Sequence, residues 1–341
     1  MAERPIIIPI FVPHKGCPHD CIFCNQKKIS GQLEEMTAEK VPQIIEAHLA
    51  TIRPGSAVEV AFYGGSFTAI DKTAQESFLK AASPYLADGR VSEIRLSTRP
   101  DHIEDEILDL LKKYGVKTIE LGVQSLDESV LNASSRGHDA SCVRKAAALI
   151  REKGFRLGIQ TMTGLPGDSR EKCLETAKEV VSLSPEMVRI YPVLVIKGTE
   201  LERLYNEGLY RPQTLDEAVG LCAELLEIYE SNGINVIRIG LQPTESIRSG
   251  PESEVAAGPM HPAFRQLVES RRILLKLETE IAAQGLVGTK ELIIRTGSSN
   301  ISNVTGQKRS NVEYLKQRFG IRLIRVLSED SLGNKFTLNK G

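Results

Sequence analysis

Cys17-Pro18-His19-Asp20-Cys21-Ile22-Phe23-Cys24 is the stretch that decides how this chain of 341 residues folds. It places three thiols within eight residues, in the spacing C-x3-C-x2-C, soon after an apolar run at residues 6–12 that predicts a buried strand. This spacing allows one short loop to set three sulfur atoms around a single iron–sulfur cluster. A cluster of four irons normally takes four cysteines, and the others here are isolated in helix-like stretches. One iron would therefore keep an open coordination position, where chemistry can occur.

The same cysteines allow two other interpretations. Together with His14 or His19 they supply the ligands of a closed Cys3His zinc site, which stays open as an alternative. A disulfide framework is disfavoured, because three clustered cysteines are an odd number and the first residues do not have the layout of a secretory signal. Reduced cysteines without an export signal predict a cytoplasmic protein.

The composition is that of an ordinary globular protein, with 41% hydrophobic and 26% charged residues. The formal net charge of −1 gives no global attraction to a polyanion, so any nucleic-acid surface must be a local patch. No apolar run reaches the length that crosses a membrane, and we therefore expect no membrane partner. The chain is long enough for a large core and a small second domain.

Strand patterns alternate with helix patterns through the first half of the chain. Such alternation predicts a parallel sheet with helices outside it, either an open doubly wound sheet or a barrel. In both folds the chemistry collects at the C-terminal ends of the strands. The predicted strands are 6–12, 58–62, 93–97, 118–123, 156–161 and 187–191.

Glycines and polar residues follow these strands directly. Gly64 and Gly65 allow the backbone to approach a ligand closely, although a tight strand–helix turn also explains the pair. Arg99 is a suitable partner for a carboxylate at the mouth of the fold, or an ordinary exposed arginine. The residues at the strand ends are Gly64, Gly65, Ser66, Ser97, Arg99, Gln124, Arg136 and Gln160, followed by a glycine loop at residues 164–168.

The cysteine motif, with Phe23 directly before its third cysteine, resembles the signature of the radical S-adenosylmethionine (radical SAM) superfamily. The resemblance implies an α/β fold, namely a partial (β/α)6 TIM-like barrel. It also implies a 4Fe–4S cluster held by Cys17, Cys21 and Cys24, whose open iron binds S-adenosylmethionine. Reductive cleavage of that cofactor yields a 5′-deoxyadenosyl radical, with flavodoxin or ferredoxin as the expected electron donor.

The family pattern also assigns roles to the strand ends. The segment 64–66 matches the part that holds the amino group of S-adenosylmethionine. Gln124 and Arg136 match contacts to its ribose and carboxylate, and Gln160 matches a further position near the ribose. The cofactor-binding residues that the resemblance implies are Phe23, Gly64, Gly65, Ser66, Ser97, Arg99, Gln124, Arg136 and Gln160.

Within the superfamily, residues 6–245 resemble the radical SAM domain of the Elongator catalytic subunit. The matching segments include Tyr63-Gly64-Gly65-Ser66-Phe67, Ser97-Thr98-Arg99-Pro100-Asp101 and Gly164-Leu165-Pro166-Gly167. The Elongator subunit has a longer gap between its first two cysteines and carries an acetyltransferase domain, whereas no glycine-rich acetyl-CoA loop follows residue 245 here. The resemblance therefore implies RNA modification, with tRNA as the substrate, but not the use of acetyl-CoA.

The C-terminal part carries a local excess of positive charge. Residues 285–325 contain eight basic and two acidic residues, a net charge of +6, and read as strand, loop, helix and strand. The turn Gly306-Gln307-Lys308-Arg309 partly resembles the phosphate-clamping GXXG loop of KH modules, with arginine in place of the last glycine. A solvated appendage with a basic face is the alternative. The candidate RNA-binding residues are Lys308, Arg309, Lys316 and Arg322.

These observations predict three parts: a radical SAM barrel at 1–245, a lid and basic helix at 246–284, and a basic α+β domain, KH-like in its loop, at 285–341. The predicted function is radical SAM modification of RNA. Two alternatives stay open: an enzyme acting on a small molecule, such as an anaerobic porphyrinogen oxidase, and a non-catalytic relative resembling a haem chaperone. No residue is predicted to be catalytic; the residues named are expected to bind the cluster, S-adenosylmethionine or RNA.

Overall fold

The computed structural model describes residues 5–12, 17, 21–25, 36–241, 247 and 253–341. The chain divides into two compact units, one of residues 1–214 with 228–260, the other of residues 215–227 with 261–341. Helix α9 (Leu215–Ser231) contributes residues to both. In the described part of the chain, no helix has the length and apolar character needed to cross a membrane.

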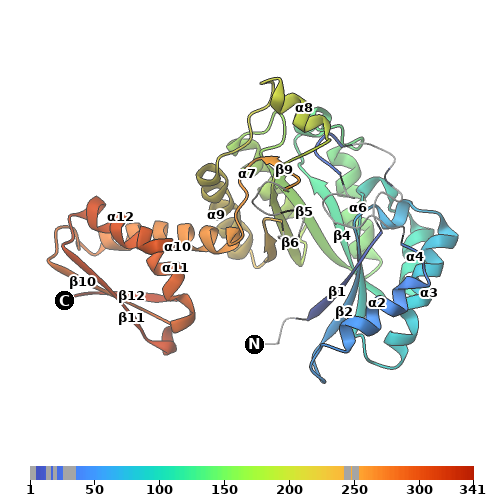
Figure 1. Cartoon of the computed structure of the whole chain (residues 1–341), viewed down its shortest axis with the longest axis horizontal. Coiled ribbons are helices and arrows are strands. Elements are labelled where there is room, and N and C mark those ends of the chain that lie inside the picture. The colour runs from blue at the N-terminus through green and yellow to red at the C-terminus, as the bar shows by residue number, and fades with distance from the viewer. Residues whose placement is uncertain (1–4, 13–16, 18–20, 26–35, 242–246, 248–252) are drawn as a thin grey trace. The chain divides into compact units, whose positions relative to one another are not determined.

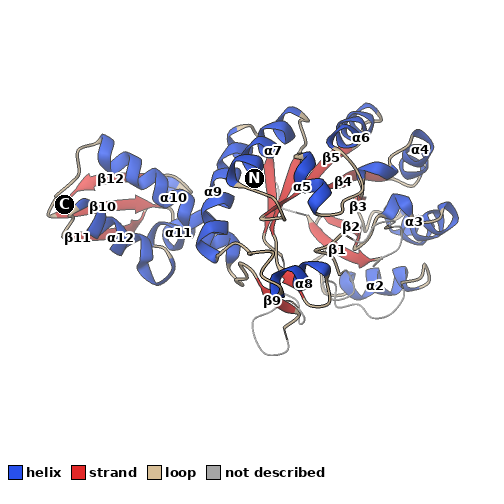
Figure 2. Cartoon of the chain, turned by 90° about the horizontal axis from the view of Figure 1, so that it is seen from above, coloured by secondary structure: helices blue, strands red, loops and turns tan. Residues whose placement is uncertain are grey.

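Within the described residues, the first unit is built on a parallel sheet of seven strands in the order β1-β2-β3-β4-β5-β6-β8. Figure 2 shows these strands curled into a half-barrel, with α2, α3, α4 and α6 on its outer side. The predicted partial TIM-like barrel is thereby confirmed, with β8 as one strand more than expected. The strands are β1 (Ile6–Phe11), β2 (Val58–Tyr63), β3 (Glu93–Thr98), β4 (Val116–Gln124), β5 (Arg156–Thr163), β6 (Met187–Pro192) and β8 (Asn235–Ile239); the helices between them are α2 (Lys40–Leu49), α3 (Lys72–Ala87), α4 (Asp105–Lys113), α5 (Glu128–Ala133), α6 (Ala140–Glu152), α7 (Arg170–Ser182) and α8 (Glu200–Asn206).

The strands are apolar because both faces of the sheet are covered. Ile8, Leu96 and Leu121, on β1, β3 and β4, are fully buried. Helix α4 shows the matching pattern for a surface helix: acidic residues occupy its first turn, basic residues its last turn, and Leu108 and Leu111 face the core. The sheet therefore fixes the strand ends at one edge, where the polar residues predicted for the site follow.

Some elements were not predicted. Strand β9 (Val255–Ala257) pairs antiparallel with β7 (Val195–Ile196), so the stretch 246–262, expected to be a loop, contains a strand. Helices α8 and α9 were also missed. Residues 242–245, the end of the stretch that resembles the Elongator catalytic subunit, lie outside the described residues.

The second unit contains a three-stranded sheet in the order β11-β10-β12, covered by helices (Figure 1). Strands β10 and β11 are parallel, whereas β12 runs antiparallel to β10. Leu277, on the long helix α10, packs into one core with Leu292, Leu315 and Ile324. The elements are α10 (Phe264–Ala283), β10 (Glu291–Thr296), α11 (Ile301–Thr305), α12 (Ser310–Phe319), β11 (Leu323–Ser328) and β12 (Phe336–Lys340).

Candidate functional site

The second half of the cysteine motif is tied into the fold. The backbone of Ile22 donates to Ser134 at 3.3 Å and accepts a hydrogen bond from the backbone of Leu201 at 2.8 Å. Cys21, Ile22 and Phe23 are buried in an apolar cluster with residues such as Leu165, and Cys24 packs against it. Cys17 is exposed. His14 and His19, the candidate fourth ligands of a zinc site, lie outside the described residues.

Two arginines converge on the Cys21 sulfur. Nη1 of Arg136 donates to it at 3.1 Å, and Nη1 of Arg99 lies 4.0 Å away. Arg99 is held by a bidentate pair with Asp101, at 2.9 and 2.8 Å, and donates to the backbone carbonyl of Arg136 at 2.5 Å. Two guanidinium groups therefore place positive charge directly beside this sulfur atom.

Cys17 experiences the same charges. Although the residue as a whole is exposed, its thiol is partly shielded from water; this shielding and the neighbouring Cys21 raise the pKa of the thiol, while Arg99, Arg136 and a hydrogen bond with the Ser66 backbone lower it in part. Cys17 therefore lies within electrostatic reach of Cys21 and beside the segment that follows β2. A cofactor that binds these sulfur atoms as thiolates would favour their deprotonated forms and so counteract the effect of burial on the pKa.

The ends of β2 and β3 are joined through buried hydroxyl groups. Oγ of Ser66 lies 2.9 Å from Oγ1 of Thr98, and it accepts a hydrogen bond from the backbone of Arg99 at 3.2 Å. Gly64 has a φ of 98°, a conformation that favours glycine. Gly65 and Ser97 line the same narrow gap, together with Phe67. The predicted residues of these two strand ends are thus brought together.

Gln124 ends β4 in a strained conformation. Its φ is 69°, and the pairing of β4 with β5 shifts register between Gly122 and Gln124. A Cβ atom on Gly122 would lie 3.1 Å from Nε2 of Gln124 and 3.6 Å from Nη2 of Arg136, so these side chains gather over the glycine. Left-handed backbone at a non-glycine residue is typical of functional sites. No pattern in the sequence points to this backbone conformation.

Gln160 lies apart from this group. Its Nε2 donates to Oε2 of Glu120 at 3.1 Å, inside the barrel. Glu120 also accepts from Arg95 at 2.8 Å, from Arg189 at 3.0 Å and from the Tyr63 hydroxyl at 3.0 Å. The structure therefore places Gln160 in an interior ionic network and bonds it to none of the other predicted site residues.

The sequence analysis missed this interior network. Arg95 joins Glu120 to Glu59, whose Oε2 it contacts at 2.9 Å. Burial would raise the pKa of Glu120, but Arg189 and Arg95 outweigh it and lower that pKa to about 2. Burial and the negative charge of Glu120 raise the pKa of Tyr63. Single charged residues at alternate positions of otherwise apolar strands are the signal that points to such a network.

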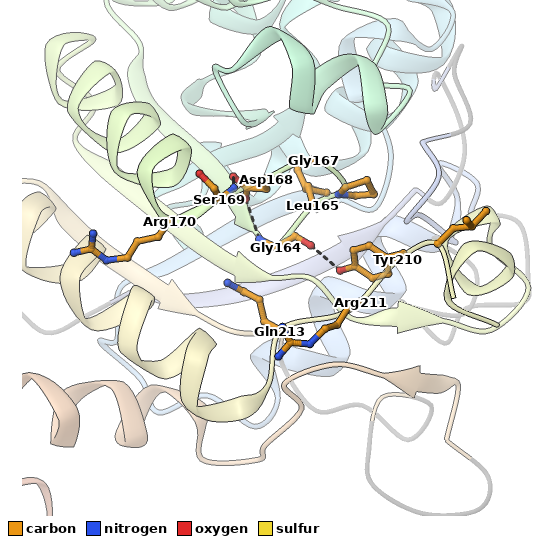
Figure 3. Close-up of a pocket in the computed structure, with 11 residues that line it drawn as sticks. Gly164, Leu165, Gly167, Asp168, Ser169, Arg170, Tyr210, Arg211 and Gln213 are labelled. Atoms are coloured by element: carbon orange, nitrogen blue, oxygen red, sulfur yellow. Dashed lines mark hydrogen bonds between the residues drawn. The ribbon is translucent and has the colours of Figure 1, made fainter. Parts of the chain in front are cut away.

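A rim pocket of about 290 Å³ lies beside the glycine loop (Figure 3). The loop from Gly164 to Arg170 forms one side and residues 209–213 form the other. The Tyr210 hydroxyl donates to the Gly164 carbonyl at 2.6 Å, and Asp168 accepts from the Gly164 backbone at 2.9 Å. Leu165, which also lines this pocket, belongs to the apolar cluster that includes Cys21, Ile22 and Phe23.

The arrangement fits a cofactor that is anionic and ligated by sulfur. Nε of Arg136 and Nε2 of His138 are buried and have no hydrogen-bond partner within the described chain. Burial, together with Arg136 and Arg99, lowers the pKa of His138 to about 4. In the described residues no three His, Cys, Asp or Glu side chains are already grouped as for a metal ion, so the ligand assignment of the three cysteines stays a prediction.

The half-barrel brings a cysteine loop, arginines and glycines to the ends of its strands, which is where enzymes of barrel folds gather their chemistry. The family comparison agrees: the model of the radical SAM superfamily matches residues 11–180, and that of the radical SAM C-terminal domain matches residues 185–273. The chain belongs to the radical SAM superfamily, a family of enzymes that use a 4Fe–4S cluster and S-adenosylmethionine.

Relatives narrow the position within the family. An uncharacterized protein of Methanocaldococcus jannaschii is 33% identical over 70% of this chain and 76% of its own length. The tRNA uridine(34) acetyltransferase of the same organism is 26% identical, over 62% of this chain and 47% of its own length. The structure of Elp3 from Methanocaldococcus infernus matches with a TM-score of 0.60 at 21% identity, over 84% of this chain and 64% of that chain. The chain thus spans about half the length of the tRNA uridine(34) acetyltransferase it matches.

Proposed function

We propose that this chain binds a 4Fe–4S cluster through Cys17, Cys21 and Cys24 and uses it with S-adenosylmethionine to modify RNA, with tRNA as the substrate. When bound, these cofactors supply a 5′-deoxyadenosyl radical that removes hydrogen from an unreactive C–H bond. The observation that carries the proposal is the convergence of Arg99 and Arg136 on the buried Cys21 sulfur. Cations at this point offset the negative charge of thiolate ligands.

The residues of the chain bind, orient and shield. Arg136 has a second guanidinium edge whose buried Nε lacks a partner in the described chain, and this edge suits the carboxylate of S-adenosylmethionine. Gly64, Gly65 and Ser66 offer backbone groups for its amino group. Gln124, held over Gly122, supplies an amide for the ribose. Phe23 excludes water from the cluster side.

Three other predicted residues act less directly. Arg99 holds the carbonyl of Arg136 and so orients that arginine. Ser97 lines the same narrow gap as Gly65. Gln160 donates a hydrogen bond to Glu120 and so belongs to the ionic network inside the barrel. To contact the cofactor, it would have to exchange that hydrogen bond for a new one.

The substrate proposal rests on the relatives. A tRNA uridine(34) acetyltransferase and Elongator complex protein 3 are among them, and they match over 62% and 50% of this chain. Because this chain spans only part of each, their complete activities are not transferred to it. Flavodoxin or ferredoxin as electron donor and a cytoplasmic location complete the proposal.

Anaerobic reconstitution tests the cofactor site. We expect a brown protein with iron and sulfide, which forms 5′-deoxyadenosine from S-adenosylmethionine when dithionite is added. Cys21→Ala should lose both the iron and the product, whereas Cys142→Ala, a change at a cysteine on the outer helix α6, should keep both. Colourless, zinc-loaded protein would contradict the proposal. If the protein forms 5′-deoxyadenosine and the addition of bulk tRNA does not change that activity, only the proposed substrate is contradicted.

A further inference from the structure

The second unit contains a strand–helix–turn–helix–strand segment that the proposed radical chemistry does not use. Strand β10 leads into α11, the turn Gly306–Arg309 joins α11 to α12, and β11 returns parallel to β10. In KH modules a GXXG loop between two helices clamps the backbone of about four nucleotides. We propose that this unit binds single-stranded RNA, with the phosphates at the turn and the bases along β11.

The turn is fixed in place by the rest of the unit. A Cβ atom on Gly306 would lie 2.5 Å from Oγ of Ser310 and 2.7 Å from the backbone nitrogen of Asn311, so only glycine fits. Nδ2 of the buried Asn311 donates to the carbonyls of Ser270 and Asn303, at 3.0 and 3.1 Å. These bonds hold the turn against α10 and α11. Because the turn is already ordered, it loses little conformational entropy when a ligand binds.

The cations of the turn have no partner to neutralise them. Lys308 and Arg309 are exposed, and their side chains make no ion pair with any described residue. They occupy consecutive left-handed positions, with φ of 51° and 65°. An arginine at the fourth position of the motif, where KH modules have glycine, adds a charge to the surface. Two adjacent exposed cations on a rigid turn suit the phosphates of a polyanion.

A second group of cations stands at the other end of α12. Arg318, Arg322 and Lys290 are exposed and likewise form no ion pair with the part of the chain described. The backbone of Leu323 bonds to that of Lys290 at 3.1 Å, which brings the starts of β10 and β11 together. Helix α12 has ten residues, so the two groups are about 15 Å apart. The intervening length fits a short run of nucleotides.

Lys316, a predicted RNA contact, and the nearby Arg325 do not belong to this surface. Lys316 pairs with Glu313 at 3.0 Å, and Arg325 pairs with Glu291 at 2.7 Å. Because those charges are already neutralised, they add little attraction for a phosphate. We therefore define the basic track as Lys308 and Arg309 at one end of α12 with Lys290, Arg318 and Arg322 at the other.

The strand beside the basic track favours an unpaired strand of RNA. β11 is an edge strand, with backbone groups on its outer side available to a ligand. Leu323 and Leu327, 42% and 37% exposed, offer apolar surface on this strand. Unstacked bases can pack against such surface and bond to the edge, whereas bases inside a duplex cannot reach it. Charge and apolar surface together point to single-stranded RNA.

The test uses the full-length protein and a labelled single-stranded RNA of about 12 nucleotides, with fluorescence anisotropy at several salt concentrations. The variant Lys308→Glu/Arg309→Glu should weaken binding at least tenfold. Lys308→Gln/Arg309→Gln should reduce the salt dependence, making the slope of log K against log salt less negative by about 1.4 for two lost phosphate contacts. The matched control, Lys335→Glu/Lys340→Glu, changes the same charge on exposed residues at the β12 side of the unit.

Equal losses in the turn variant and the control would overturn the proposal, as would a duplex of the same sequence binding as tightly as the single strand. If the turn variant unfolds, as circular dichroism would show, the Gln variant decides alone: an unchanged salt slope overturns the proposal. RNA binding does not depend on the cluster. A protein that binds RNA but makes no 5′-deoxyadenosine would fail the proposed function and leave this inference standing, and the reverse result would do the opposite.

Discussion

Glu120→Gln should destabilise the barrel strongly without altering its shape. Glu120 is 1% exposed and accepts hydrogen bonds from Arg95, Arg189, Tyr63 and Gln160. Glutamine has nearly the same volume, so packing is preserved. It has no charge, however, and its amide group can accept only part of these bonds. The substitution removes the carboxylate from two buried guanidinium groups, of which Arg95 keeps its pair with Glu59.

The structure sets the size of the effect. Breaking a buried ion pair from one side costs about 3–5 kcal/mol. The pKa of Glu120 gives an independent figure, because its fall from the ordinary 4.5 to about 2 corresponds to about 3 kcal/mol of stability at neutral pH. Both routes lead to about 3 kcal/mol. Since the pKa is lowered by folding, the stabilisation is complete above about pH 4.5 and is lost as the pH falls towards 2.

Urea unfolding followed by circular dichroism measures the difference. Glu120→Gln should lower the free energy of unfolding by about 3 kcal/mol at pH 7, and the gap to the wild type should narrow below pH 4.5. Glu106→Gln is the control, since that carboxylate is 86% exposed and its pair with Lys72 contributes about 0–1 kcal/mol. Equal effects of the two substitutions at pH 7 would refute the view that the interior network stabilises the barrel.

Three smaller predictions concern conformation and titration. Gln124→Val should destabilise the protein by about 1 kcal/mol in urea unfolding and Gln124→Gly should not, because a β-branched residue tolerates a φ of 69° poorly; equal behaviour would contradict the strain. The ring of His138 should titrate near pH 4 in NMR spectra, and its contribution to stability should decline as the pH falls from 6.5 to 4; a midpoint near 6.5 would show that Arg136 and burial do not act on it. Gly306→Ala should speed hydrogen exchange in α12, since its methyl group meets Asn311; unchanged exchange would show that the turn relaxes freely.

The sequence predicted the barrel because its strands are nearly continuous apolar runs. Residues 6–12 and 118–123 coincide with β1 and β4 to within a few residues, since strands covered on both faces need apolar side chains throughout. Strand β8 was missed because it is short and carries Arg238 among its apolar residues. The gathering of Arg99 and Arg136 followed from their places after strands three and four, because parallel strands end at one edge. Their approach to the Cys21 sulfur could not be predicted, because it depends on how the cysteine loop packs against these strand ends.

The interior network could not be predicted from pattern alone. Glu59, Arg95, Glu120 and Arg189 lie on four different strands, and each appears in the sequence as a charge with apolar neighbours on both sides. Period 2 shows which strand positions share a face, but the register between distant strands decides which charges meet. Gln160 was assigned to the cofactor site on the family pattern, and the same register gives it Glu120 as a partner.

Charge is handled differently in the barrel and in the C-terminal turn, and the difference separates structural from binding residues. In the barrel, Arg95 and Arg189 each form an ion pair with the buried Glu120, so their charges are neutralised within the fold and link neighbouring strands. At the turn, Lys308 and Arg309 meet none among the described residues, although their backbone is held in an unfavourable conformation. Those two charges form no ion pair that would stabilise the fold, and the left-handed backbone at these residues costs free energy. Their neutralisation is therefore left to a ligand, and a phosphate backbone supplies negative charges at the spacing that adjacent cations can use.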